Sequence, residues 1–344
     1  MIEIRAGDFA VWKSWIAFVA PVRGRHLPAL LAGILLMSGV ASANEPGWPS
    51  RTVRIVVAYP PGGATDVYGR MLAASMQKVL GQPVVVDNRA GAGGAVGLNE
   101  VAKAAPDGYT LGLGLGAMTI MPSLYKNLPF DVVRDFKPVS LVLYTQNVVI
   151  VPASAPMTSM KELIAFAKAN PGKLNYASSG LGATPHLSME LLKTRAGIAI
   201  EHIPYKGDAP AMTDLLAGRV QMYSTTIGGV IQHIRSGRVR ALAVTGKTRA
   251  SVIPDIPTME EAGLKDYEIV SWYGVIAPAQ TPNPIVERLN AALIEVVSDP
   301  GVRDQIIASG ARPATSTPAQ FAELIKNDLV RFGQIAKAAG VQPE

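Results

Sequence analysis

Short apolar runs rich in Val and Ile alternate with longer segments of helical periodicity along almost the whole chain, and this alternation restricts the possible folds more than any other feature. In the first part of the chain it predicts strands at TVRIVVAY, PVVVDN and YTLGLGLG, with helices over residues 65–80 and 94–104. Strands that alternate with helices are typical of a mostly parallel sheet with crossover helices. We therefore expect an α/β protein.

A second series of strands and helices follows LPFDVVRDFKPVSLV, a segment whose prolines and mixed charges predict a loop leading into the strand VVIVP. No Gly/Ser linker separates the two series, so we expect two lobes joined by crossover strands, with a cleft between them. The second series predicts strands at LNYAS, IEHIPY, VQMYSTT and VRALAVT, and helices over 159–170, 185–195, 208–217 and 228–236. The last part predicts a strand at IVSWYGVIAP, a helix over 283–298 and two further amphipathic segments.

The amino-terminal region predicts an exported protein. Arg23 and Arg25 precede LPALLAGILLMSGVASA, an apolar stretch that ends in the small residues accepted by signal peptidase. A membrane-spanning helix needs about 20 apolar residues, and this stretch is shorter. We therefore expect residues 1–43 to be a signal peptide cleaved after Ala43. The chain contains no cysteine, so we expect no lipid-modified cysteine, no thiol chemistry and no membrane anchor in the mature protein.

A strand ends and a helix begins at YPPGGATD, where two prolines and two glycines interrupt an apolar run. The prolines cannot continue a strand ladder, whereas Gly62 and Gly63 can turn the backbone sharply. Thr65 or Asp66 can begin the helix. Free N–H groups at such a helix start favour a carboxylate or phosphate, although an ordinary capped turn is the alternative. We name residues 59–66 the first corner.

The same pattern occurs in the second series, at NYASSGLGATPHLSMELL. Here a short strand passes through serines and glycines into a helix with Pro185 in its first turn, preceded by Thr184, which is a strong helix-start signal. Hydroxyl and backbone N–H groups converge at this point, so two anion-favouring helix starts would meet across the cleft. For His186 a local structural role is the alternative. We name residues 178–186 the second corner.

Two further stretches border these corners. The run NRAGAGGAVG has glycines between a strand and a helix, but its spacing departs from the dinucleotide-binding pattern and no acidic residue follows at the required distance. We expect Asn88 and these glycines to form a second wall beside the first corner. In PYKGDAPAM, Tyr205 and Lys206 end a strand and would border the cleft, unless Lys206 is an ordinary surface charge.

Several function classes are excluded or unsupported. The net charge is +6, basic residues are scattered and aromatic residues make up 6%, so we expect no nucleic-acid binding. The histidines at 186, 202 and 233 lack the spacing of metal ligands, and we expect no metal and no cofactor. Neither a G-x-S-x-G nor an H-E-x-x-H motif is present, and Asp66 and Asp208 each lie at a predicted helix start, where capping is the simpler role. The sequence therefore favours a binding protein over an enzyme.

With these residues described, the sequence resembles the Bug family, the periplasmic solute receptors of tripartite tricarboxylate transport systems. The motifs that carry the resemblance cover nearly all of the mature chain. They are YPPGGATD, NRAGAGGAVG with VAKAAPDGYTL, LPFDVVRDFKPVSLV, SSGLGATPH, PYKGDAPAMTDLLAGRV and PDIPTMEEAGLKDYEIVSWYGVIAP. The sequence departs from the family pattern at Ala90 and Gln280, both outside the two corners.

The resemblance implies a periplasmic protein with a type II periplasmic-binding-protein fold, in which two α/β lobes close over a small carboxylate. It implies lobes at 44–145 with 268–344, and at 146–267. It also implies a monomer that delivers its ligand to the membrane subunits of a transporter or, alternatively, to a sensor kinase. A hydrolase or transferase on this fold is a weaker alternative. The implied ligand-binding residues are Tyr59, Gly62, Gly63, Ala64, Thr65 and Asp66 in the first corner, and Ser179, Gly180, Gly182, Ala183, Thr184 and His186 in the second.

Overall fold

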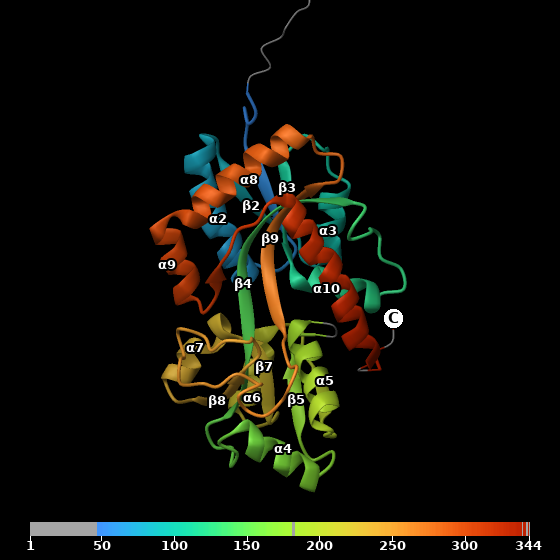
Figure 1. Cartoon of the computed structure of the whole chain (residues 1–344), viewed down its shortest axis with the longest axis vertical. Coiled ribbons are helices and arrows are strands. Elements are labelled where there is room, and N and C mark those ends of the chain that lie inside the picture. The colour runs from blue at the N-terminus through green and yellow to red at the C-terminus, as the bar shows by residue number, and fades with distance from the viewer. Residues whose placement is uncertain (1–46, 181–182, 339, 342, 344) are drawn as a thin grey trace, which may run out of the picture. The chain divides into compact units, whose positions relative to one another are not determined.

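The computed structural model describes residues 47–180, 183–338, 340–341 and 343. The predicted signal peptide, residues 1–43, lies outside the described residues. Two portions of sheet share the long strand β4 (Phe136–Pro152), which Figure 1 shows beside β9 (Val270–Pro278). The strand order is β2-β1-β3-β9-β4-β7-β5-β6, and β8 and β10 also pair with β4.

We name the two portions A and B. Portion A contains β4, β9, β1 (Val53–Val57), β2 (Val84–Asn88), β3 (Thr110–Leu115) and β10 (Arg312–Pro313). Portion B contains β4, β5 (Asn175–Ser178), β6 (Glu201–Pro204), β7 (Met222–Thr226) and β8 (Val239–Val244). Within each portion the short strands that alternate with helices are parallel, whereas β4 and β9 pair antiparallel with their neighbours.

Helices cover both faces of each portion because their apolar sides pack on the Val- and Ile-rich strands. On portion A, one face carries α2 (Ala64–Leu80), α8 (Asn283–Ser298) and α9 (Pro300–Ala308), and the other carries α3 (Ala95–Ala102) and the first half of α10 (Pro318–Ala338). On portion B, one face carries α4 (Met160–Ala169) and α5 (Thr184–Ala196), and the other carries α6 (Asp208–Leu216) and α7 (Ile227–Arg235).

Helix α10 packs against the cores of both portions. Phe321 and Ile325, near its start, belong to a core cluster of portion A. Phe332 and Ala336, near its end, belong to a core cluster of portion B. Among the residues that the structure describes, three short 3-10 helices lie in the loops that follow β2 and β3: Ala92–Gly94, Gly116–Thr119 and Met121–Ser123.

The two-lobed α/β architecture is confirmed, with two corrections. The segment LPFDVVRDFKPVSLV is not a loop throughout, because β4 begins at Phe136. Pro138 suggested a loop, yet the register of β4 against β9 shifts next to it, and such an irregularity lets a strand include a residue that has no N–H to donate. The sheet is also mixed rather than mostly parallel, since β4 and β9 run antiparallel to their neighbours.

Candidate functional site

The carboxyl ends of the parallel strands in portions A and B face each other along β4. In portion A, Leu115 at the end of β3 pairs with Tyr273 of β9, which pairs with Leu143 of β4. In portion B, Thr226 at the end of β7 pairs with Asn147 of β4. The four steps from 143 to 147 correspond to about 13 Å of extended strand. Ligands of open α/β sheets bind outside the carboxyl ends of their strands, so these facing ends are the candidate site.

The first corner has an uncapped helix start. Gly62 has φ +85°, which glycine adopts without strain, and Gly63 is the N-cap of α2 without a hydrogen-bonding side chain. Gly62, Gly63 and Ala64 are exposed, whereas Thr65 and Asp66 are buried. The first turn of α2 therefore presents backbone groups rather than a capping side chain to whatever lies beyond it.

Asp66 holds the shape of the first corner. Its Oδ2 accepts hydrogen bonds from the Gly62 N–H over 2.9 Å and from Arg70 Nε over 3.0 Å. Its Oδ1 accepts one from Asn88 Nδ2 over 3.0 Å and lies 2.9 Å from Arg70 Nη2. These bonds, with that of Arg70 foremost, lower the pKa of Asp66 to about 2. Asp66 is 4% exposed and its carboxylate oxygens already accept hydrogen bonds, so the carboxylate is an internal part of the first corner.

The glycine run after β2 lies against the first corner, as predicted. Asn88 Nδ2 also donates to the Tyr59 carbonyl over 3.1 Å, and the Tyr59 hydroxyl donates to the Gly93 carbonyl over 2.9 Å. Burial raises the pKa of Tyr59, so its phenol stays a neutral donor. The bonds of Asn88 and Gly93 with Tyr59 thus attach the glycine run after β2 to the end of β1. This glycine run is the second wall that the sequence predicted.

The second corner is held by Ser178, which is fully buried. Its hydroxyl donates to the Gly180 carbonyl over 3.0 Å, accepts from the Gly180 N–H over 3.2 Å and lies 2.6 Å from His202 Nε2. Gly180 has φ +135°, a conformation that favours glycine. Ala183 is the N-cap of α5 and has no capping side-chain bond. Gly182 lies outside the described residues.

Thr184 and His186 begin α5, and both are buried. The His186 ring stacks on the His202 ring, with centroids 4.2 Å apart and an interplanar angle of 18°. Burial lowers the pKa of His186. His186 is therefore buried within the second corner, whereas Ser179 and Ala183 are partly exposed at its surface.

Two tyrosines that the sequence did not predict as site residues border the corners. The Tyr273 phenol of β9 interacts with the side chain of Thr65 in the first corner, and the Tyr223 phenol of β7 interacts with that of Ser179 in the second. The Tyr223 hydroxyl also donates to the carboxylate of Asp208 at the start of α6. Burial raises the pKa of both phenols, and the charge of Asp208 adds to this at each of them. Asp208 therefore lies within electrostatic reach of residues from both portions.

A backbone contact joins portions A and B beside these tyrosines. The Tyr68 ring packs edge-on against Tyr273 with centroids 4.9 Å apart, and its hydroxyl lies 2.8 Å from Ser309 Oγ. The Ser309 carbonyl is so close to Gly228 of α7 that a Cβ on that glycine would lie 2.8 Å from the oxygen. The turn after α9 therefore rests directly on the start of α7.

Of the two residues predicted to border the cleft, Tyr205 faces α6. Its hydroxyl donates to Asp214 Oδ2 over 2.8 Å. Lys206 is exposed and precedes Gly207, which has φ +111° and is the N-cap of α6. Asp208, interpreted from the sequence as a helix-start residue, does begin α6, but its bond with Tyr223 also directs it toward the corners.

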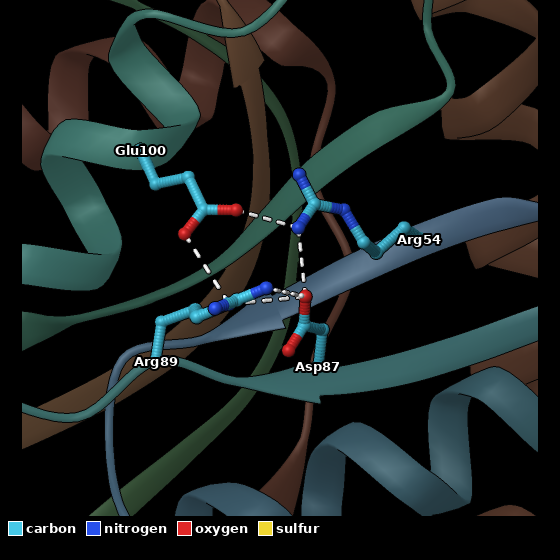
Figure 2. A network of polar contacts seen from close by, with 4 residues as sticks. All are labelled: Arg54, Asp87, Arg89 and Glu100. Atoms are coloured by element: carbon cyan, nitrogen blue, oxygen red, sulfur yellow. Dashed lines mark hydrogen bonds and ion pairs between the residues drawn. The ribbon is translucent and has the colours of Figure 1, made fainter.

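A charged network lies on the face of portion A that α3 covers, opposite α2 (Figure 2). Arg54 Nη1 contacts Asp87 Oδ2 over 2.7 Å and Glu100 Oε1 over 2.5 Å. Arg89 contacts the same two carboxylates over 3.0 and 3.3 Å. Two guanidinium and two carboxylate groups balance, so the network joins β1, β2 and α3 and adds no net charge.

Other kinds of site were sought in the part of the chain that the structure describes. It contains no cluster of three or more histidine, aspartate or glutamate side chains positioned to hold a metal ion. Among the described helices, none combines the length and the apolar character needed to cross a membrane.

Comparisons with known proteins give consistent matches. A family model described as tripartite tricarboxylate transporter family receptor matches residues 68–341. Protein BugT of Bordetella pertussis is 38% identical over 320 residues, which are 92% of this chain and 98% of BugT. Rpa4515 of R. palustris, solved with adipate, is 36% identical with a TM-score of 0.82, covering 86% of this chain and 100% of that one. MatC (Rpa3494) from Rhodopseudomonas palustris, with bound malate, is 32% identical with a TM-score of 0.75, covering 84% and 99%.

Proposed function

Because the chain belongs to the family of tripartite tricarboxylate transporter receptors, with the periplasmic-binding-protein fold that the sequence resemblance implied, we propose that it is a periplasmic receptor for a small organic acid. It captures the ligand between the first and second corners and presents it to the membrane subunits of a transporter. It carries out no chemistry on the ligand. The lobes of this receptor are residues 44–145 with 268–344, and residues 146–267.

The observation that carries this proposal is the pair of facing helix starts. The helices α2 and α5 both begin without a side-chain cap, and both follow strands whose carboxyl ends face the other portion along β4. The positive end of a helix dipole and free backbone N–H groups stabilise a carboxylate without a cationic side chain. A carboxylate held by both corners favours the closed arrangement, because a ligand shifts such an equilibrium only through contacts that differ between the two states.

Burial divides the proposed site residues into two groups. The exposed or partly exposed residues are proposed to contact the ligand, and the buried ones are proposed to hold the corners in shape: Thr65, Asp66, Thr184 and His186. Gly182 is retained as a ligand contact by its place in the second corner. The contacting residues are therefore Tyr59, Gly62, Gly63, Ala64, Ser179, Gly180, Gly182 and Ala183.

The ligand class follows from the relatives as well as from the corners. Rpa4515 and MatC were solved with adipate and malate, both aliphatic dicarboxylates. We therefore place aliphatic dicarboxylates first among the ligands of this chain.

Ligand-induced closure tests this function. Thermal-shift and solution-scattering measurements on the mature chain with adipate, malate and a panel of mono- and tricarboxylates should show one or more acids that raise the melting temperature and reduce the radius of gyration. Gly180→Val should abolish both effects, because valine cannot easily adopt φ +135°. Gly172→Val is the matched control, since Gly172 also has a positive φ, +72°, but precedes β5 at the opposite edge. No response to any acid, or an equal loss in both variants, would contradict the proposal.

A further inference from the structure

His202 lies next to the second corner, yet the proposed function gives it no role. It is on β6, two residues before the strand ends, and pairs with Tyr176 of β5. Its Nε2 reaches Ser178 Oγ over 2.6 Å. Its ring lies between Tyr176, with centroids 4.8 Å apart, and His186, with centroids 4.2 Å apart. One side chain therefore touches both the strand that enters the corner and the helix that leaves it.

The hydrogen bonds of Ser178 indicate which ring nitrogen of His202 carries the hydrogen. A serine hydroxyl has one proton to donate and two lone pairs to accept with. Ser178 donates that proton to the Gly180 carbonyl and accepts the Gly180 N–H. The third contact of Ser178 is satisfied only if His202 Nε2 carries a hydrogen and donates it. In that tautomer the imidazole fixes the rotation of the hydroxyl, and the hydroxyl fixes both backbone groups of Gly180.

We infer that His202 is a positioning residue of the second corner, which holds Ser178, Gly180 and the start of α5 in the arrangement that ligand binding requires. The inference rests on the proposed function of that corner. His202 acts through Ser178 and His186 and does not itself touch the ligand. It also acts as a neutral group, so it does not attract the organic acid by charge.

The surroundings of the imidazole explain its neutrality. Burial, with additional contributions from His186 and Lys193, lowers the pKa of His202 to about 3. The charged groups that face this stack come from α5: Glu190 is held by the Tyr176 hydroxyl over 2.5 Å and by Lys193 over 2.8 Å. The Glu190 carboxylate is thus already paired, and a second proton on His202 would add a charge that both burial and the Lys193 ammonium disfavour.

Four variants and one control variant test the inference, with adipate affinity measured by calorimetry. Ser178→Ala removes the hydroxyl, and His202→Phe keeps a flat ring for stacking but removes the donor. Each should weaken adipate binding about tenfold, and the double variant should be no weaker than either single one, because both remove the same interaction. His202→Gln, whose amide nitrogen can replace the Nε2 donor, should restore most of the affinity. His233→Phe, in the last turn of α7, is the control and should bind as the wild type does.

The pH profile separates positioning from charge attraction. Wild-type adipate affinity should stay constant between about pH 6 and 8, the range over which a histidine of ordinary pKa loses its charge. A fall in affinity across that range, additive losses in the double variant or unchanged binding by His202→Phe would overturn the inference.

A ligand-free measurement separates failure of the inference from failure of the proposed function. In nitrogen-15 NMR spectra without ligand, the Gly180 amide signal should move and exchange faster in both Ser178→Ala and His202→Phe, and His202→Gln should largely restore it. If no carboxylate binds the wild type but Gly180 responds in this way, the proposed function fails and the positioning role stands. If Gly180 does not respond to Ser178→Ala, the smaller change, the positioning role fails.

Discussion

The side-chain amide of Asn88 donates a hydrogen bond of 3.0 Å to Asp66 Oδ1, and this bond ties the end of β2 to the first turn of α2. The same carboxylate accepts the Gly62 N–H on its other oxygen. Asp66 is thus the point at which a strand end, a glycine turn and a helix start are held together. The first corner keeps its shape through an internal anion, although the proposed ligand is itself an anion.

We expect Asp66→Asn to lower the free energy of unfolding by about 2 kcal/mol, because an amide cannot accept all the donors that converge on the buried carboxylate. Denaturant unfolding measures the change. Asp304→Asn on the exposed side of α9 is the control and should stay within about 0.5 kcal/mol of the wild type. A loss of equal size in both variants would contradict the assignment.

The contribution of Asp66 also depends on pH. Its pKa is lowered in the folded protein, to about 2, so its stabilisation is present above the ordinary aspartate pKa of about 4 and is lost as the pH falls toward 2. The stability difference between the wild type and Asp66→Asn should therefore be constant above about pH 5 and shrink in acid. Melting temperatures measured across this range show whether it does.

Asp208→Asn should strengthen the binding of dicarboxylates severalfold. The charge of Asp208 reaches the Tyr273 phenol, so it also acts against an anion placed between the corners. Calorimetry at low and high salt measures the effect, which should diminish as salt screens the charge. Asp214→Asn is a matched control on the same helix, because Asp214 is engaged with Tyr205 and Arg219. Equal affinities in wild type and Asp208→Asn would place the ligand away from α6.

Gly228→Ala should weaken ligand-induced compaction. The added Cβ would lie 2.8 Å from the Ser309 carbonyl, so α7 and the turn after α9 would have to move apart. Solution scattering should show a larger radius of gyration with ligand, and the dissociation constant should rise severalfold. Gly333→Ala in α10 is the control, since the nearest atom to its Cβ, Ser123 Oγ, is 3.7 Å away. If Gly228→Ala compacts normally, the contact is not required for closure.

Arg54→Met should lower the free energy of unfolding by about 1 kcal/mol and leave ligand affinity unchanged. The substitution removes the guanidinium that Asp87 and Glu100 share (Figure 2), but these groups are partly exposed and lie on the face of portion A that α3 covers, opposite α2. Arg51→Met, which removes a more exposed pair with Asp107, should cost less. Urea unfolding and calorimetry on the same samples test both parts. A change in ligand affinity would show that the network supports the first corner directly.

The helix starts were predictable from the sequence because their signals are local. Pro60 and Gly62 end a strand and turn the chain whatever surrounds them, and Thr184 with Pro185 begins α5 in the same way. The limits of β4 were not predictable in this way. Pro138 indicates a loop when only neighbouring residues are considered, and its place in a strand depends on pairing with residues of β9, more than a hundred positions later.

The roles of the two tyrosines that border the corners were also not predictable from the sequence. Tyr223 and Tyr273 lie in apolar strand segments, where a phenol resembles any other core aromatic residue. Their roles follow from the partners that the fold supplies: Ser179 and Asp208 for Tyr223, and Thr65 for Tyr273. Each of these partners lies outside the strand that carries the tyrosine, so local periodicity carries no signal of the pair.

The membership of β9 and β10 in portion A has a consequence for the order of folding. The strands β1, β2 and β3 are synthesised first, but their sheet is continued by β9 and β10, which come after all of portion B. The edge of β3 that later pairs with β9 therefore remains unpaired during synthesis of portion B. A chain that stops before residue 270 would therefore leave this edge open to pairing with another chain, and we expect such fragments to aggregate rather than to fold as shortened receptors.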